Sequence, residues 1–142
     1  MGLLIGVGNN KPSFPYTQYY GIQKDMSASA TACTRVGLEA LHRSLPIQSK
    51  MRRCLLADDG TVVTYLNASN SALTDTGAAA DLTGASGQYM VEIPKHYVKF
   101  ELESSVLTVL FSEYALPGFI EIPKHYTSAV EATVQQIGRA HV

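Results

Sequence analysis

Arg53-Cys-Leu-Leu-Ala-Asp-Asp-Gly-Thr-Val-Val-Thr-Tyr-Leu66 is the stretch of sequence that decides the fold. Two apolar runs rich in strand-forming residues flank the polar residues 58–60, and Gly60 supplies the positive φ that a tight hairpin turn requires. We therefore predict a β-hairpin over residues 53–66 that turns at residues 58–60. The hairpin favours a β-dominated α+β fold for the chain.

Downstream of the hairpin, a polar segment precedes further strands. Residues 67–87 are almost all Asn, Ala, Ser, Thr, Asp and Gly, which predicts a long loop and a module boundary. Residues 88–102 and 106–111 predict strands, and Ser104-Ser105 predicts the turn between them. From residue 98 to 103 apolar and charged residues alternate, which predicts one buried face. Its expected members are Val98, Phe100 and Leu102.

One hexapeptide occurs twice in this downstream part. Glu92-Ile-Pro-Lys-His-Tyr97 recurs letter for letter as Glu121-Ile-Pro-Lys-His-Tyr126. The flanking sequences differ, so the pattern does not predict a solenoid. A proline interrupts a strand in each copy, which predicts an edge strand or a bulge because proline has no backbone donor.

Upstream of the hairpin, the predicted structure is less regular. Residues 9–21 contain two prolines, three tyrosines and a glycine, which predict an extended arm rather than a helix. Residues 25–34 are small and polar and predict a loop. Residues 37–45 predict a short helix that ends before Pro46, with three leucines on one face.

Composition and charge narrow the class of protein. Of the 142 residues 46% are hydrophobic and 16% are charged, which is typical of a folded globular protein. The net charge is −1, with a basic excess before residue 57 and an acidic excess after it. A nucleic-acid binder would have a purer basic face, so a solvated strand end is the favoured interpretation of the basic residues. Neither a bilayer-spanning segment nor a signal peptide is predicted.

The sequence predicts no catalytic, cofactor or metal site, and binding residues stay unassigned. The pairs Glu92/His96 and Glu121/His125 have an i, i+4 spacing that could hold a metal or relay a proton on a straight strand. The intervening proline opposes that alignment, so solvated polar side chains are favoured. For Cys33 and Cys54 we favour two small buried thiols over a disulfide or a zinc site. The eight tyrosines favour binding faces and subunit contacts, with about half of them in the core.

An ordered set of segments carries a family resemblance. It comprises residues 10–22, Cys33-Thr-Arg-Val-Gly37, residues 41–48, residues 51–56, Gly87-Gln-Tyr-Met-Val-Glu-Ile-Pro94, Ser112-Glu-Tyr-Ala-Leu-Pro-Gly118 and Ala129-Val-Glu-Ala-Thr-Val-Gln135. Over residues 1–135 this order resembles tail-fibre or tropism-determinant-like proteins of phages and prophages of gut anaerobes.

The resemblance implies a domain organisation. Residues 1–87 would form an N-terminal arm, short helix and hairpin module. Residues 88–136 would be the opening strands of a truncated C-type-lectin-like domain, the fold that formylglycine-generating enzymes also use. Val130 stands where the family has Tyr, which affects local packing. Residues 137–142 read as a translated short-read sequencing adapter, and we expect them to be an artefact.

The resemblance also implies a function. A structural, non-enzymatic phage-tail protein would mount a host-surface receptor-binding module on the virion after synthesis in the host cytoplasm. Its partners would be other tail subunits, including copies of itself, and a receptor bound through the missing C-terminal part, without nucleic acid, cofactor or membrane insertion. The alternatives are a bacterial surface adhesin of the same fold and a fragment of a formylglycine-generating-type enzyme. The enzyme would need a reactive cysteine pair in the missing part.

Overall fold

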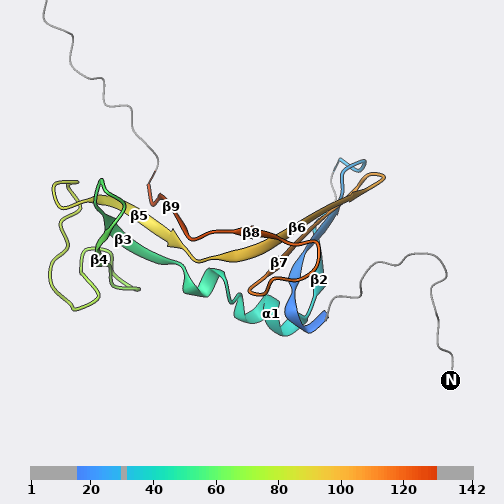
Figure 1. Cartoon of the computed structure of the whole chain (residues 1–142), viewed down its shortest axis with the longest axis horizontal. Helices are drawn as coiled ribbons and strands as arrows, with labels where there is room; N and C mark the ends of the chain where they lie inside the picture. Colours follow the sequence, from blue (N-terminus) through green and yellow to red (C-terminus); the bar gives the residue numbers. More distant parts are fainter. Residues whose placement is uncertain (1–15, 30–31, 131–142) are drawn as a thin grey trace, which may run out of the picture. The chain divides into compact units, whose positions relative to one another are not determined.

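Two antiparallel sheets make up most of the structure, a computed structural model that describes residues 16–29 and 32–130 (Figure 1). The strand order is β2-β1-β7-β6-β8 in one sheet and β4-β3-β5-β9 in the other. The fold is therefore β-dominated, as predicted. The first sheet comprises β1 (Tyr20–Asp25), β2 (Thr34–Gly37), β6 (His96–Glu103), β7 (Val106–Ser112) and β8 (Ile120–Ile122). The second comprises β3 (Arg52–Leu56), β4 (Val62–Tyr65), β5 (Gln88–Ile93) and β9 (His125–Ser128).

The chain divides into two compact units that each hold one sheet. Unit 1 comprises Met1–Pro46 and His96–Ile122, and unit 2 comprises Ile47–Lys95 and Pro123–Val142. This division differs from the predicted boundary between residues 87 and 88. The physical reason is a hydrogen-bonded ladder: β5, which begins at Gln88, pairs with β3 over five residues of each strand. A boundary at residue 87 would cut through this ladder.

Unit 1 is built from two hairpins, β1–β2 and β6–β7, joined by pairing of β1 with β7. The short helix α1 (Glu39–Ser44) packs against β1 and β2, where the His42 ring lies edge-on to Tyr20 at 5.8 Å between centroids. The His42 Nε2 atom lies 2.8 Å from the carbonyl oxygen of Val36. The helix predicted before Pro46 is thus confirmed.

The predicted arm over residues 9–21 is only partly covered by the described residues, which begin at Tyr16. Tyr16–Gln18 form a 3-10 turn (η1), and Tyr20 starts β1 with a side chain only 3% exposed. The extended conformation predicted for this segment is thus found at Tyr20 and Gly21, but Tyr16–Gln18 turn, and the strand belongs to the sheet rather than to a separate arm. Pairing on both sides, with Gly37 in β2 and Phe111 in β7, places Tyr20 inside the sheet.

The predicted buried face of β6 is confirmed only at its first residue. Val98 is 4% exposed, but Phe100 is 63% and Leu102 is 68% exposed. Val98 pairs with Phe111, which in turn pairs with the buried Tyr20, whereas Phe100 and Leu102 lie further along β6 from this buried group. The alternation itself is real, and the turn predicted at Ser104-Ser105 is confirmed, with Ser104 in a left-handed conformation.

Unit 2 contains the predicted hairpin. β3 pairs with β4, Gly60 has φ = 85°, and the Ala57 amide donates to the Thr61 carbonyl oxygen at 2.9 Å. The register shifts between Leu55 and Leu56, which marks a bulge beside the turn. Cys54 is fully buried and Leu55 is 2% exposed, so the hairpin supplies the centre of the unit 2 core.

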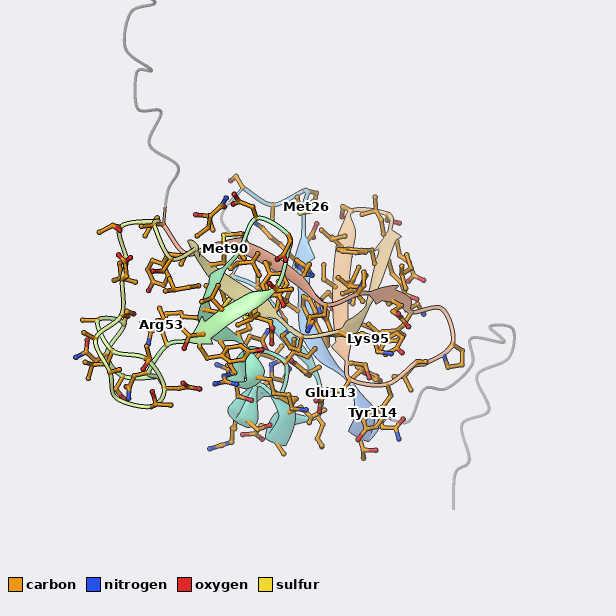
Figure 2. The ribbon with its side chains drawn as sticks, turned by 60° about the vertical axis from the view of Figure 1, so that its left-hand side comes forward. Met26, Arg53, Met90, Lys95, Glu113 and Tyr114 are labelled. Atoms are coloured by element: carbon orange, nitrogen blue, oxygen red, sulfur yellow. The ribbon has the colours of Figure 1, made fainter. Side chains whose placement is uncertain are left out.

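The loop predicted over residues 67–87 is confirmed, and bridges and hydrogen bonds hold it in place. Isolated bridges join Leu66 to Thr74 and Leu73 to Ala79. The guanidinium group of Arg53 (labelled in Figure 2) donates to the Asn67 carbonyl oxygen at 3.1 Å and also to the Ser71 hydroxyl group. The start of the loop is therefore fixed to β3. Among residues 16–29 and 32–130 no helix is long and apolar enough to cross a membrane.

Candidate functional site

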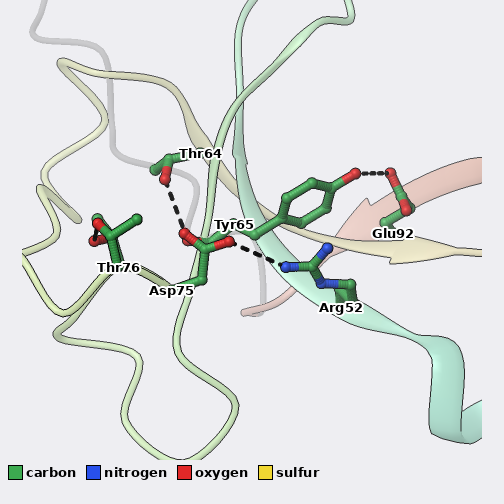
Figure 3. Close-up of polar contacts among 7 residues, drawn as sticks. Arg52, Thr64, Tyr65, Asp75, Thr76 and Glu92 are labelled. Atoms are coloured by element: carbon green, nitrogen blue, oxygen red, sulfur yellow. Dashed lines mark hydrogen bonds and ion pairs between the residues drawn. The ribbon is translucent and has the colours of Figure 1, made fainter.

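A group of polar side chains in unit 2 surrounds Glu92 near the end of β5. Glu92 Oε2 accepts hydrogen bonds from the hydroxyl groups of Tyr65 and Tyr126, each at 3.0 Å. Lys124 Nζ lies 3.8 Å from the same oxygen, and the Glu92 side chain is only 13% exposed. Figure 3 shows the Tyr65–Glu92 hydrogen bond. Together the four residues form what we call the Glu92 cluster.

The strand register explains why these residues meet. Arg52 and Tyr126 are the cross-strand partners of Glu92 on β3 and β9. Tyr65 reaches it from β4 because Tyr65 pairs with Cys54, two residues after Arg52 on β3. Directly opposed and diagonal side chains on one face of a sheet lie within reach of one another when they are long or aromatic. The Glu92 cluster is therefore a product of antiparallel pairing.

The pKa values of the side chains around Glu92 are shifted by its carboxylate and by burial. Burial, followed by the hydrogen bond to Glu92, raises the pKa of Tyr65, and the same two causes raise the pKa of Tyr126. The negative charge of Glu92 raises the pKa of Lys124. Both phenols thus stay protonated donors and the amine stays charged near neutral pH.

Arg52 connects the Glu92 cluster to the loop after β4. Its guanidinium group lies over the Tyr65 ring, 3.6 Å from the ring centroid, in a cation–π contact. Its Nη2 atom lies 3.2 Å from Asp75 Oδ2, an ion pair that is visible in Figure 3. This side of unit 2 is therefore cross-linked by polar contacts among β3, β4, β5, β9 and the loop.

A pocket of about 280 Å³ opens beside these contacts. The residues that line it are Met51, Arg52, Arg53, Leu66, Asn67, Ala68, Asp75 and Val91. Arg53, its second basic residue, already donates to the loop at Asn67 and Ser71, and the Tyr89 hydroxyl group donates to Ser71 Oγ at 2.9 Å. The charged groups of the pocket wall thus hold the loop in place.

The second copy of the hexapeptide makes a matching contact in unit 1. The Tyr97 hydroxyl group donates to Glu121 Oε2 at 3.2 Å, across the pairing of β6 with β8. In both units, then, a tyrosine that ends one copy of the hexapeptide binds a glutamate that begins the other copy. Unlike Glu92, Glu121 is an exposed residue.

The histidines considered as partners of these glutamates belong to strands of the other sheet. Glu92 and His96 belong to β5 and β6, which are in different sheets, and Glu121 and His125 are likewise divided between β8 and β9. The spacing on one strand that metal binding or proton relay would need is therefore absent from both copies. Within residues 16–29 and 32–130, no cluster of three or more His, Cys, Asp or Glu could hold a metal ion.

The prediction of two small buried thiols is confirmed for one cysteine and wrong for the other. Cys54 is buried and Cys33 is exposed beside β2, and both thiols are free. Burial raises the pKa of Cys54, which keeps it a protonated, unreactive thiol. Cys33 is exposed because it lies just before the edge strand β2.

Sequence reasoning did not identify Tyr65, Tyr126, Lys124, Arg52 or Asp75 as members of a site. A signal was nevertheless present in the repeated hexapeptide. If a hexapeptide pairs with a copy of itself in antiparallel register, its first residue faces the last residue of the other copy. That rule predicts both glutamate–tyrosine contacts.

The chain was compared with known families, proteins and structures. No protein-family model, curated protein or solved structure matches this chain.

Proposed function

We propose that the protein is a non-catalytic structural component of a phage tail, on which a receptor-binding module for the host surface is mounted. The ordered resemblance along residues 1–135 supports the class. The structural observation that carries the proposal is an exposed apolar strip on the unit 1 sheet, which suits contact with other subunits. In this proposal the protein resides in the virion.

The apolar strip consists of Ile22 on β1, Phe100 and Leu102 on β6, and Ile120 on β8. Their exposures are 42%, 63%, 68% and 62%. Phe100 faces Val109, which in turn faces Ile22, and Ile120 faces Val98, so the register puts all four residues on one face. Soluble monomers seldom expose contiguous apolar surface of this kind, so the strip supports assembly with further copies of the chain.

The polar groups of unit 2 support a structural role over an enzymatic one. Glu92 accepts bonds from two phenols, and Arg53 is committed to the loop. The one buried cysteine of unit 2, Cys54, has a raised pKa and stays a protonated thiol. The charged and phenolic groups that the fold brings together are thus used to join strands.

The finer assignment of residues 88–136 to the opening strands of a C-type-lectin-like domain is also a proposal. The antiparallel strands β5 to β9 within this range support it. In this proposal the receptor-contacting surface belongs to a C-terminal continuation of that domain. The sequence of a longer genomic contig tests this point, because tail or reverse-transcriptase genes beside it would support the phage assignment.

The role of the apolar strip is tested by the oligomeric state in solution. Replacing both Phe100 and Leu102 by serine should convert an oligomer into a smaller species in analytical ultracentrifugation. The matched control is Glu103→Ser, because Glu103 is an exposed residue on the opposite face of β6. This variant should leave the oligomer intact. A monomeric unsubstituted chain at micromolar to millimolar concentration would overturn the assembly role.

Location on the virion is tested directly by immunogold electron microscopy. Antibodies raised against the full chain should label tails of virus particles purified from the sample that yields the gene. Label confined to bacterial envelopes, with none on particles, would favour the surface adhesin and contradict the proposal.

A further inference from the structure

The two copies of the hexapeptide pair with one another in antiparallel register. In unit 2, Glu92 faces Tyr126 and Ile93 faces His125. In unit 1, His96 faces Ile122 and Tyr97 faces Glu121. In both sheets the first and second residues of one copy thus face the sixth and fifth residues of the other. The hexapeptide is therefore complementary to itself in antiparallel register.

The side chains reinforce this self-complementarity. Tyr126 donates to Glu92 at 3.0 Å and Tyr97 donates to Glu121 at 3.2 Å, so the same pair of residue types meets at each end of the matched segments. Because the two copies have the same six residues, each copy carries both halves of this recognition. A copy from another molecule offers the same donors and acceptors as the copy in the same chain.

The second copy is the more weakly held of the two. Its strands β8 and β9 lie at the edges of their sheets and have one neighbour each, whereas β5 and β6 have two neighbours each. The β8 strand is three residues long and β9 is four, and Ile120 is 62% exposed. Fewer ladder bonds and little buried apolar area make this segment the one that opens most readily.

A natural hinge precedes the second copy. Pro117 and Gly118 form a turn in which the Phe119 amide donates to the Leu116 carbonyl oxygen at 3.0 Å, and Gly118 has φ = 79°. If this turn extends, residues 119–128 can leave the first copy of their own chain without breaking any other strand pairing. A second molecule in the same state then offers an identical unpaired first copy.

We propose that two molecules of this chain exchange residues 119–128, so that the second hexapeptide of each pairs with the first hexapeptide of the other. Every pairing of β8 with β6 and of β9 with β5 is then remade between molecules. Exchange of identical elements costs little because the contacts are the same in monomer and dimer, and the balance is set by hinge strain and concentration. This inference stands independently of the phage-tail proposal.

Two singly substituted full-length chains test the exchange. Glu92→Cys and Tyr126→Cys are made separately in a Cys33→Ser background, carry different affinity tags, and are mixed at up to about 1 mM, the range of the effective concentration of a short flexible link. Mild oxidation should give a disulfide-linked heterodimer, because residues 92 and 126 are directly opposed. Buried Cys54 stays in place.

Matched controls make either outcome decisive. Thr127→Cys replaces Tyr126→Cys in the control mixture and should give no heterodimer, because its side chain points to the other face of β9 and cannot be bridged to position 92. A single chain with both Glu92→Cys and Tyr126→Cys should form an internal disulfide when dilute. Internal disulfide without any heterodimer up to the highest concentration overturns the exchange, and absence of the internal disulfide overturns the pairing on which it rests.

The hinge gives a second, independent test. Gly118→Ala strains the left-handed turn of the closed monomer by an amount typical of that backbone region, and this strain is released when the hinge extends. The dimer association constant should therefore rise roughly tenfold or more, as measured by analytical ultracentrifugation. A constant that stays the same or falls would overturn the assignment of the hinge.

Discussion

The two copies of Glu-Ile-Pro-Lys-His-Tyr have one sequence but different surroundings. In the first copy, His96 is 8% exposed and the Glu92 side chain is 13% exposed. In the second copy, Glu121 and His125 are exposed residues. The first copy lies on inner strands and the second on edge strands. The difference teaches that the place of a residue in the ladder, rather than its local sequence, sets its burial here.

The largest expected difference concerns the two glutamates. Glu92→Ala should lower the free energy of unfolding by about 2 kcal/mol, because two partly buried phenols lose their acceptor. Glu121→Ala should cost less than about 1 kcal/mol, because its one contact is exposed. Urea denaturation followed by circular dichroism measures both. Equal costs would remove the distinction between the copies.

The histidines should show the next largest difference. His96→Ala creates a space beside Phe111, whose ring centroid lies 6.5 Å from that of His96, and should cost about 1–2 kcal/mol of stability. His125→Ala should change stability by no more than about 0.5 kcal/mol, because the ring is exposed. Thermal and urea unfolding of the two variants provide the comparison. A costlier loss at position 125 would contradict the burial pattern.

Removal of single hydroxyl groups should produce a smaller effect. Tyr126→Phe should cost about 1 kcal/mol, since it removes one of the two hydrogen bonds to Glu92. Tyr97→Phe should cost about half as much or less, because its bond to Glu121 is exposed. Both variants keep the ring, so the difference isolates the hydrogen bond. Identical values would show that the neighbourhood of Glu92 adds nothing.

The smallest expected effect is the loss of stability of the Glu92 cluster at alkaline pH. The pKa values of Tyr65 and Tyr126 are raised in the folded chain, so above the ordinary value near 10 the folded state holds more protons than the unfolded state. Stability from this source is present below pH 10 and falls as pH rises further. The double variant Tyr65→Phe/Tyr126→Phe should lose stability less steeply above pH 10 in urea titrations. An unchanged slope would contradict the assignment.

Local features of this fold were predictable from sequence, and long-range ones were not. The Asp-Gly turn at residues 58–60, the strands on either side of Ser104 and the short helix before Pro46 are all confirmed. Each depends on turn chemistry or on a period within a few residues. The division of the chain into two compact units differs from the predicted boundary at residue 87, because β5 pairs with β3, more than 30 residues earlier in the chain.

The exposure of Phe100 and the composition of the Glu92 cluster could not be predicted from the sequence for a related reason. A period of two assigns residues to the two faces of a strand, but it does not say how far along the strand that face is buried. The Glu92 cluster combines residues from β4, β5 and β9 with Lys124, which directly precedes β9, and only the strand order brings them together. The proline of each hexapeptide predicted an edge or a bulge; the edge is confirmed for the second copy, whereas the strands of the first copy are inner strands.

The reverse pairing of the two hexapeptides is the central claim of this account, and nuclear Overhauser contacts measure it most directly. In the full-length, isotope-labelled chain, backbone protons of Glu92 should show contacts to Tyr126, and those of Tyr97 should show contacts to Glu121. Both sets should be present together, whether the partners belong to one molecule or to two. Pairing of either copy in another register, or no contact between the copies, would contradict the account.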